Sequence, residues 1–165
     1  MKNEGAESLK PDQDGWLFIA WVFGRESIFE TLSKHLVVKS DVTSASTSGS
    51  PLSQIFLSPN GNPLASPMPP DIVESILKGR DQLLGDLLHI PYMRLSNLES
   101  AMLSSSTSCI MGSQSNVCDA AIYGSLVSSL LNTSLYPRRT SGEFTGSVAF
   151  LGDILSCIQM VYIKS

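Results

Sequence analysis

With 165 residues, the chain has room for one domain, or for one domain with loose ends. Hydrophobic residues make up 42% and are enough for a core, whereas charged residues make up only 16%, against ~25% in typical soluble domains. This deficit favours a protein that covers part of its surface with a partner, and a net charge of −4 without a basic stripe argues against nucleic-acid binding.

Residues 1–13 are polar and are expected to form a disordered leader. The run Trp16–Phe23 is apolar on every side, stops at Gly24 and is too short to cross a bilayer, which needs ~20 residues. We therefore expect a buried helix that begins at Gly15 or Trp16 and packs against other surfaces. Its aromatic residues are candidates for the core or for an interaction surface: Trp16, Phe18, Trp21 and Phe23.

The segment 25–38 is predicted to form a second helix. Its apolar residues recur at helical spacing, and they are Ile28, Phe29, Leu32 and Leu36. Glu30 and Lys34 stand four residues apart in the favoured orientation. The two helices are expected to form a tight hairpin hinged at Gly24, with Phe29 as a fifth core or interaction candidate.

The stretch 39–69 is predicted to be a long connector. Its tract 40–50 is rich in serine and threonine, shows no periodicity and is expected to be disordered, as part of a flexible loop over 40–66. Residues 55–57 are expected to be extended and to be followed by a turn at 59–62, because Asn-Gly is a strong turn signal. This pattern allows one small β-hairpin.

The segment 70–89 is predicted to be the best helix of the chain. Its apolar stripe consists of Ile72, Val73, Ile76, Leu77, Leu83, Leu84, Leu87 and Leu88. Its acidic residues are expected to form the solvated side, and they are Asp71, Glu74, Asp81 and Asp86. Pro91 should end or kink this helix, and 92–103 can continue as helix.

The C-terminal part should contain a second serine-rich flexible loop at 104–115, a helix from Asn116 or Asp119 to about Leu135, a helix over 147–160, and a tail at 161–165. The predicted fold is therefore all-α: an irregular bundle of four to six helices over 14–160, with long serine-rich loops and room for one short hairpin. Eight residues are expected to be buried together: Trp21, Phe23, Phe29, Leu32, Ile76, Leu84, Ile122 and Leu126.

Catalytic chemistry is not indicated by the sequence. His35 and His89 lie near the ends of predicted helices, where histidines commonly meet the helix dipole and solvent. The sequence contains no nucleophile elbow and no glycine-rich phosphate loop. We therefore assign no catalytic, cofactor-binding or metal-binding residue and no small-molecule substrate, and we expect a non-enzymatic protein.

The three cysteines are too few and too unevenly spaced for a disulfide scaffold. Cys109 and Cys118 flank one predicted loop and could approach each other, to pair or to share a metal, so a thiol- or metal-responsive regulator is the alternative function. The polar N-terminus carries no apolar signal region, and the apolar helix lacks the basic face of membrane-surface helices. These features favour an intracellular protein, cytoplasmic or nuclear, without a membrane partner.

The segment Ile19–Val37, with the sequence IAWVFGRESIFETLSKHLV, resembles the region that follows the BTB/POZ domain in fungal proteins. The likeness continues through GNPL at 61–64, MPPDIVESI at 68–76, CDAAIYGSL at 118–126 and LYP at 135–137. It implies a helical region docked behind a BTB fold, a fungal source and a role in protein association. Because the BTB fold itself would precede Trp16, the resemblance implies a fragment or truncated copy. We therefore expect a protein partner, or self-association, through the apolar face of Trp16–Phe23.

Overall fold

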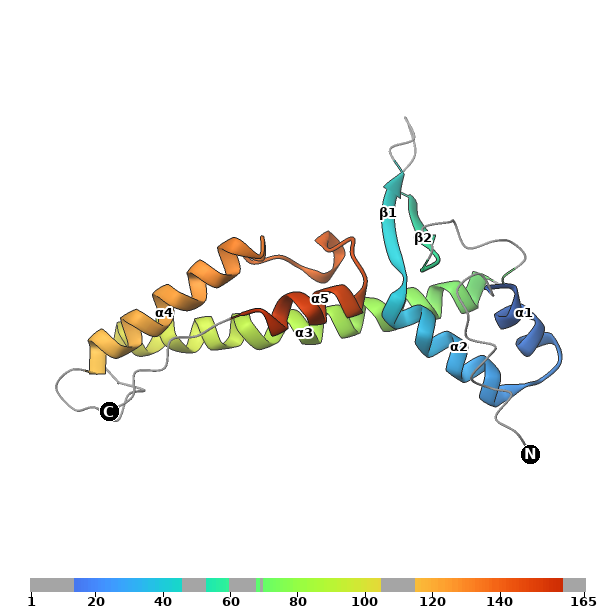
Figure 1. Cartoon of the computed structure of the whole chain (residues 1–165), viewed down its shortest axis with the longest axis horizontal. Helices are drawn as coiled ribbons and strands as arrows, with labels where there is room; N and C mark the ends of the chain where they lie inside the picture. The colour runs from blue at the N-terminus through green and yellow to red at the C-terminus, as the bar shows by residue number, and fades with distance from the viewer. Residues whose placement is uncertain (1–13, 46–52, 60–67, 69, 105–114, 159–165) are drawn as a thin grey trace. The chain divides into compact units, whose positions relative to one another are not determined.

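The computed structural model describes residues 14–45, 53–59, 68, 70–104 and 115–158. These residues form five α-helices, one short 3-10 helix and a two-stranded sheet, which confirms the predicted all-α fold with one small hairpin (Figure 1). The elements are α1 (Asp14–Val22), α2 (Glu26–Lys39), β1 (Asp41–Ala45), β2 (Ser53–Leu57), α3 (Pro70–Ser104), α4 (Ser115–Asn132), η3 (Ser141–Glu143) and α5 (Val148–Ser156).

The chain divides into two compact units where the sequence predicts one helical domain. Unit 1 comprises the residues up to Leu83 together with Thr145–Leu151. Unit 2 comprises Leu84–Phe144 and the residues from Gly152 onward. Helices α3 and α5 each contribute residues to both units. The predicted leader 1–13, the tracts 46–50 and 105–114 and the tail 161–165 lie outside the described residues.

The turn between α1 and α2 is set by Gly24, as the sequence predicts. Its φ of +61° is a left-handed conformation that a residue without Cβ adopts at little cost. The Gly24 N–H donates to the Trp21 carbonyl, and the Arg25 N–H donates to the Ala20 carbonyl over 2.8 Å. These two bonds form a Schellman motif, which ends α1 and turns the chain into α2.

The core of unit 1 combines residues from α1, α2, β1 and α3. Five of them are buried and in contact: Leu17, Leu32, Leu36, Val42 and Ile76. Among the residues of α1 whose burial is described, 15–22, Leu17 and Ala20 are the buried ones, since these two positions, three residues apart, share the helix face toward the core. A helix of nine residues in a hairpin buries one face, not all of them.

The prediction that α1 is buried on all sides is therefore wrong. Trp21 is 49% exposed and Phe23 is 73% exposed. Phe29 and Ile122 are half-buried, while Leu32, Ile76, Leu84 and Leu126 are buried as predicted. The eight residues also do not share one core, because Leu84, Ile122 and Leu126 belong to unit 2.

The hairpin pairs β1 with β2 in antiparallel register, with Thr43 opposite Ile55. Residues 55–57 are extended as predicted, but their partner strand precedes them in the chain and lies inside the tract expected to be disordered. The prediction of disorder is wrong for Asp41–Ala45, which form β1. The main-chain hydrogen bonds of the paired strands order this segment, although its side chains are small. Of the predicted turn at 59–62, Pro59 lies in a turn and 60–62 lie outside the described residues.

Arg80 and Thr145 tie three segments of unit 1 together. The Thr145 carbonyl accepts a hydrogen bond from the Val42 N–H over 2.9 Å and another from Arg80 Nη2 over 3.3 Å. Arg80 Nη2 also donates to the Gly146 carbonyl over 2.6 Å. Burial lowers the pKa of the Arg80 guanidinium, while the charges of Asp41 and Asp81 act in the opposite direction.

Helix α3 continues through Pro91, so the helix does not end there. A proline inside a helix removes one main-chain hydrogen bond. Pro91 is nevertheless accommodated inside α3, where it is buried on the same stripe as the leucines around it. This stripe repeats every three or four residues and consists of Ile76, Arg80, Leu84, Leu88, Pro91, Leu95 and Leu98. The acidic residues that the sequence assigns to the solvated side of α3 are all exposed: Asp71, Glu74, Asp81 and Asp86.

In unit 2, helix α4 ends in a second Schellman motif, centred on Ser134. Its φ is 58°, the Ser134 N–H donates to the Leu131 carbonyl, and the Leu135 N–H donates to the Leu130 carbonyl. Leu130 and Leu135 are both buried, which is the hydrophobic contact that accompanies this motif. The motif directs the chain from α4 back toward α3.

The loop after α4 is held to α3 by polar side chains. The Tyr92 hydroxyl donates to the Leu135 carbonyl over 2.7 Å and accepts from the Arg139 N–H over 3.0 Å. Glu99 accepts from Arg138 over 2.7 Å and from the Tyr123 hydroxyl over 3.4 Å. Removal from water, and then the charge of Glu99, raise the pKa of the Tyr123 hydroxyl. We call Tyr92, Glu99 and Arg138 the polar clasp of unit 2.

Helix α5 spans Val148–Ser156, shorter than the predicted 147–160. Ser147 caps it, since the Phe150 N–H donates to the Ser147 hydroxyl oxygen over 3.1 Å. Before it, η3 begins with a capping box in which the Thr140 N–H and the Glu143 carboxylate are 2.7 Å apart. Val148 and Leu151 are the buried residues of α5.

Candidate interaction surface

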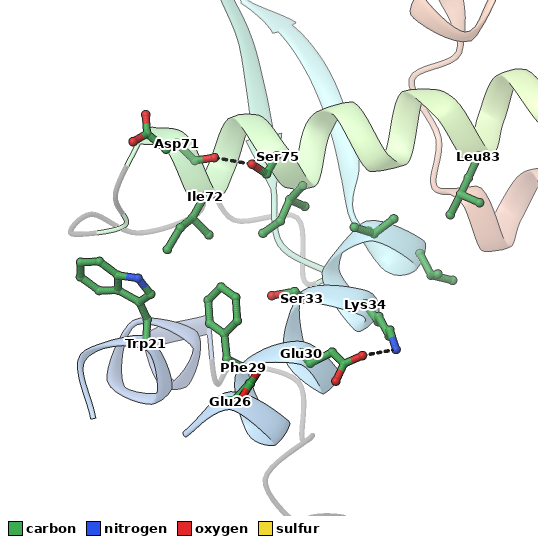
Figure 2. Close-up of a pocket in the computed structure, with 13 residues that line it drawn as sticks. Trp21, Glu26, Phe29, Glu30, Ser33, Lys34, Asp71, Ile72, Ser75 and Leu83 are labelled. Carbon is green, nitrogen blue, oxygen red and sulfur yellow. Dashed lines mark hydrogen bonds and ion pairs between the residues drawn. The ribbon is translucent and has the colours of Figure 1, made fainter. Parts of the chain in front are cut away.

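A pocket of about 720 Å3 lies in unit 1 between α2 and the first four turns of α3, with Trp21 of α1 at one end (Figure 2). The residues that form its α2 wall recur every three or four positions, and they are Glu26, Phe29, Glu30, Ser33, Lys34, Val37 and Val38. Its α3 wall consists of Asp71, Ile72, Ser75, Ile76 and Leu83. The helical spacing of both walls makes this pocket a groove that follows the two helices.

Aromatic and aliphatic side chains line most of the groove. Figure 2 shows the rings of Trp21 and Phe29 rising from α1 and α2 toward Ile72 on α3. Gly79 lies beside the groove, and a Cβ atom at this position would lie 3.6 Å from Cγ2 of Val37, so the two helices approach closely there. Phe29 and Ile72 are half-buried and also pack against the core.

Charged groups stand along the rim of the groove. Lys34 Nζ donates to Glu30 Oε1 over 2.6 Å on the solvent-exposed side of α2. This hydrogen bond, and then the positive charge of Lys34, lower the pKa of the Glu30 carboxyl. Glu26 in the first turn of α2 and Asp71 in the first turn of α3 are exposed at the end of the groove that carries Trp21.

Ser33 places a buried hydroxyl in the α2 wall. Its Oγ has no hydrogen-bond partner among the described residues. A buried hydroxyl without a partner costs roughly 1–3 kcal/mol, because it gives up its hydrogen bonds to water. The Ser33 hydroxyl therefore adds no hydrogen bond to the α2 wall among the described residues.

The outer side of α1 adds exposed apolar surface in the same unit. Trp16, Ile19, Val22 and Phe23 are all exposed, as is Trp21 at the end of the groove. Phe18 is half-buried and its ring centroid lies 6.0 Å from that of Trp21, within the range of aromatic pairs. We call these exposed residues, together with the groove, the unit 1 surface.

The sequence candidates divide between the two parts of this surface. Trp21 and Phe29 line the groove, whereas Trp16 on α1 and Phe23 directly after α1 are exposed outside the groove lining. Phe18 packs beside Trp21. Sequence reasoning missed Ser33 and the α3 wall as site residues. The signal that could have found them is a pattern shared by the two helices. Ser33 in α2 and Ser75 in α3 each place a small polar residue within an apolar stripe, on the same helix face as the apolar residues around it.

The residues considered for chemistry lie apart from the groove lining. His35 is half-buried, His89 is exposed, and Cys118 is 6% exposed in α4. Cys109 lies outside the described residues, so the pairing of Cys109 with Cys118 stays a prediction. In the part of the chain that the structure describes, no three His, Cys, Asp or Glu residues are grouped so that they could hold a metal ion.

Neither a protein-family model, nor a curated protein, nor a solved structure matches this chain. Within the described ranges, no helix combines the length and the apolar character needed to cross a membrane.

Proposed function

We propose that this chain is a non-enzymatic protein-interaction module that binds through the unit 1 surface. The observation that carries the proposal is the exposure of α1, where four large apolar residues in one helix of nine are 40–52% exposed, and Phe23, directly after the helix, is 73% exposed. Scattered exposed apolar residues are normal, but a contiguous apolar patch on a soluble protein marks a binding surface. Trp is also the residue most enriched at the centres of protein interfaces.

The composition supports the same proposal. Charged residues make up only 16% of the chain, and charge depletion is the compositional mark of interface surface. The likeness of Ile19–Val37 to the region after the BTB/POZ domain of fungal proteins belongs to this proposal, because that region packs on a neighbouring fold. So does an intracellular location, which three widely spaced cysteines favour.

The experiment measures the mass of the full chain by light scattering over a range of concentrations, together with binding of a dye that reports exposed apolar surface. We expect concentration-dependent association and dye binding. The double substitution Trp21→Ser with Phe23→Ser should reduce both, because it removes two exposed apolar side chains without opening the core. Leu103→Ser is the matched control, since Leu103 is 88% exposed but lies in unit 2.

A monodisperse monomer that binds no dye would overturn the proposal. An equal loss of association in the Leu103→Ser control would also contradict it, because the association would then depend on a general loss of apolar surface and not on α1.

A further inference from the structure

The groove of the unit 1 surface has the length of a short helix. Its α2 wall runs from Glu26 to Val38 and its α3 wall from Asp71 to Leu83, twelve residues of rise in each case. At 1.5 Å per residue, both walls are about 18 Å long. A helix of about three turns has the same length, and apolar grooves between helices commonly receive the apolar face of such a helix.

The charges of the groove favour a basic occupant. Its lining contains three carboxylates and one ammonium group, and Glu30 is already paired with Lys34. Glu26 and Asp71 remain, and neither carboxylate makes a hydrogen bond or ion pair to another described residue. Both line the same groove as Trp21, whose half-exposed ring can also receive a cation on its face.

We propose that the occupant is an amphipathic helix of a partner protein, about three turns long, with an apolar stripe toward Phe29 and Ile72 and with Lys or Arg at the end that meets Glu26, Asp71 and Trp21. This inference rests on the proposed function and specifies the partner. A fatty acid of similar length is disfavoured, since its carboxylate would meet the two acidic residues.

The test uses the full chain carrying Trp16→Phe, so that Trp21 is the sole tryptophan and its fluorescence reports the groove. The probe is a synthetic three-turn helix with leucines spaced three and four residues apart and arginines in its last turn. A matched probe has glutamines in place of the arginines. We expect saturable binding of both and roughly tenfold tighter binding of the arginine probe, with the difference falling as salt rises.

Variants of the chain locate the charge contact. Glu26→Gln with Asp71→Asn should weaken binding of the arginine probe about fivefold, since exposed ion pairs contribute up to about 1 kcal/mol each. Glu74→Gln with Asp81→Asn is the matched control, because it removes the same charge from exposed positions of α3 outside the groove lining, and it should change binding less than twofold. Ser75→Trp should block the groove, while Glu74→Trp should not.

The outcomes separate this inference from the proposed function. Equal affinity of the two probes, or equal effects of the two double variants, would overturn the basic helix even if the chain still associates and binds dye. If Ser75→Trp abolishes self-association and neither probe binds the chain, the groove binds a second copy of this chain. That result would also overturn the basic partner helix. Failure of the proposed function itself shows as a dye-negative monomer.

Discussion

Units 1 and 2 both leave large apolar residues exposed but place them differently: unit 1 gathers most of them in and directly after α1, whereas unit 2 spreads them over α3, α4 and the loop after α4. Unit 2 buries six leucines to 1% exposure or less: Leu84, Leu95, Leu98, Leu126, Leu130 and Leu135. Unit 1 leaves Trp21 and Phe23 exposed and keeps a groove beside them. The most exposed apolar residues of unit 2, Leu103 and Val117, flank the segment 105–114. An apolar stripe on one side of a helix can be covered by a core, whereas a helix that is apolar all round leaves apolar surface for a partner.

The largest expected effect separates the closed core from the groove. Leu95→Ala should lower the free energy of unfolding by about 3–4 kcal/mol, since Leu95 is fully buried and the change leaves a cavity. Phe29→Ala should cost only about 1–2 kcal/mol, because Phe29 is half-buried on a groove that solvent already reaches. Urea unfolding followed by far-UV circular dichroism measures both, and an equal cost at the two positions would break the comparison.

A smaller effect is expected from two arginines, the buried Arg80 of unit 1 and the exposed Arg138 of unit 2. Arg80→Met should cost about 2–3 kcal/mol, because Arg80 is 5% exposed and its loss leaves the Gly146 carbonyl without its donor. Arg138→Met should cost below about 1 kcal/mol, since its ion pair with Glu99 faces solvent. The same urea unfolding measures both variants. A larger loss of unfolding free energy for Arg138→Met would mean that the polar clasp stabilises the fold more than the Arg80 contact does.

The two Schellman motifs can be tested by substitutions that are expected to change stability in opposite directions. Ser134→Gly should stabilise the chain by about 1 kcal/mol, because a left-handed residue with a Cβ is strained, and Gly24→Ser should destabilise it by a similar amount. Ser134→Ala is the control, since it removes the hydroxyl and keeps the strain. Thermal unfolding measures the three variants, and stabilisation by Ser134→Ala equal to that by Ser134→Gly would show that backbone strain is not the cause.

The smallest effect concerns one exposed carboxylate in each unit. The pKa of Glu30 is lowered by Lys34, and the pKa of Glu143 is lowered by the Thr140 N–H and hydroxyl, both from an ordinary value of 4.5. Each lowered pKa adds stability above pH 4.5 that is lost as the pH falls through the folded-state value. Glu30→Gln and Glu143→Gln should each make melting temperature slightly less sensitive to acid.

Salt distinguishes the two carboxylates. Added salt should weaken the Glu30 contribution, which includes a surface ion pair, more than the Glu143 contribution, which comes from hydrogen bonds to Thr140. Melting curves at low and high salt above pH 4.5, where both contributions are fully present, measure this difference. An identical salt response of the two variants would contradict the assignment of Glu30 to charge and of Glu143 to capping.

The helices were predictable because their signals are local. The stripe of Ile28, Phe29, Leu32 and Leu36 predicts α2 from spacing alone, and Gly24 predicts the hairpin because few residues adopt its φ. The exposed side of α3 was predictable for the same reason, since Asp71, Glu74, Asp81 and Asp86 avoid its apolar stripe.

The surface was less predictable because it depends on which elements meet. No polar residue between Trp16 and Phe23 indicates which side of α1 faces the core, so the exposure of Trp21 had no local signal. Arg80 is buried only because Thr145 and Gly146, far away in sequence, present their carbonyls to it. The partner strand of β2 lies in a tract whose composition favours disorder, so composition alone did not reveal it.

The most direct test of the central claim, that unit 1 binds a partner and unit 2 does not, is hydrogen exchange of the full chain with and without the saturating arginine probe. We expect slower exchange in 17–38 and 71–83, which carry the groove walls and most of α1, and no change in 117–132 of α4. Slowing confined to 117–132, or no slowing in either region at saturation, would contradict the claim.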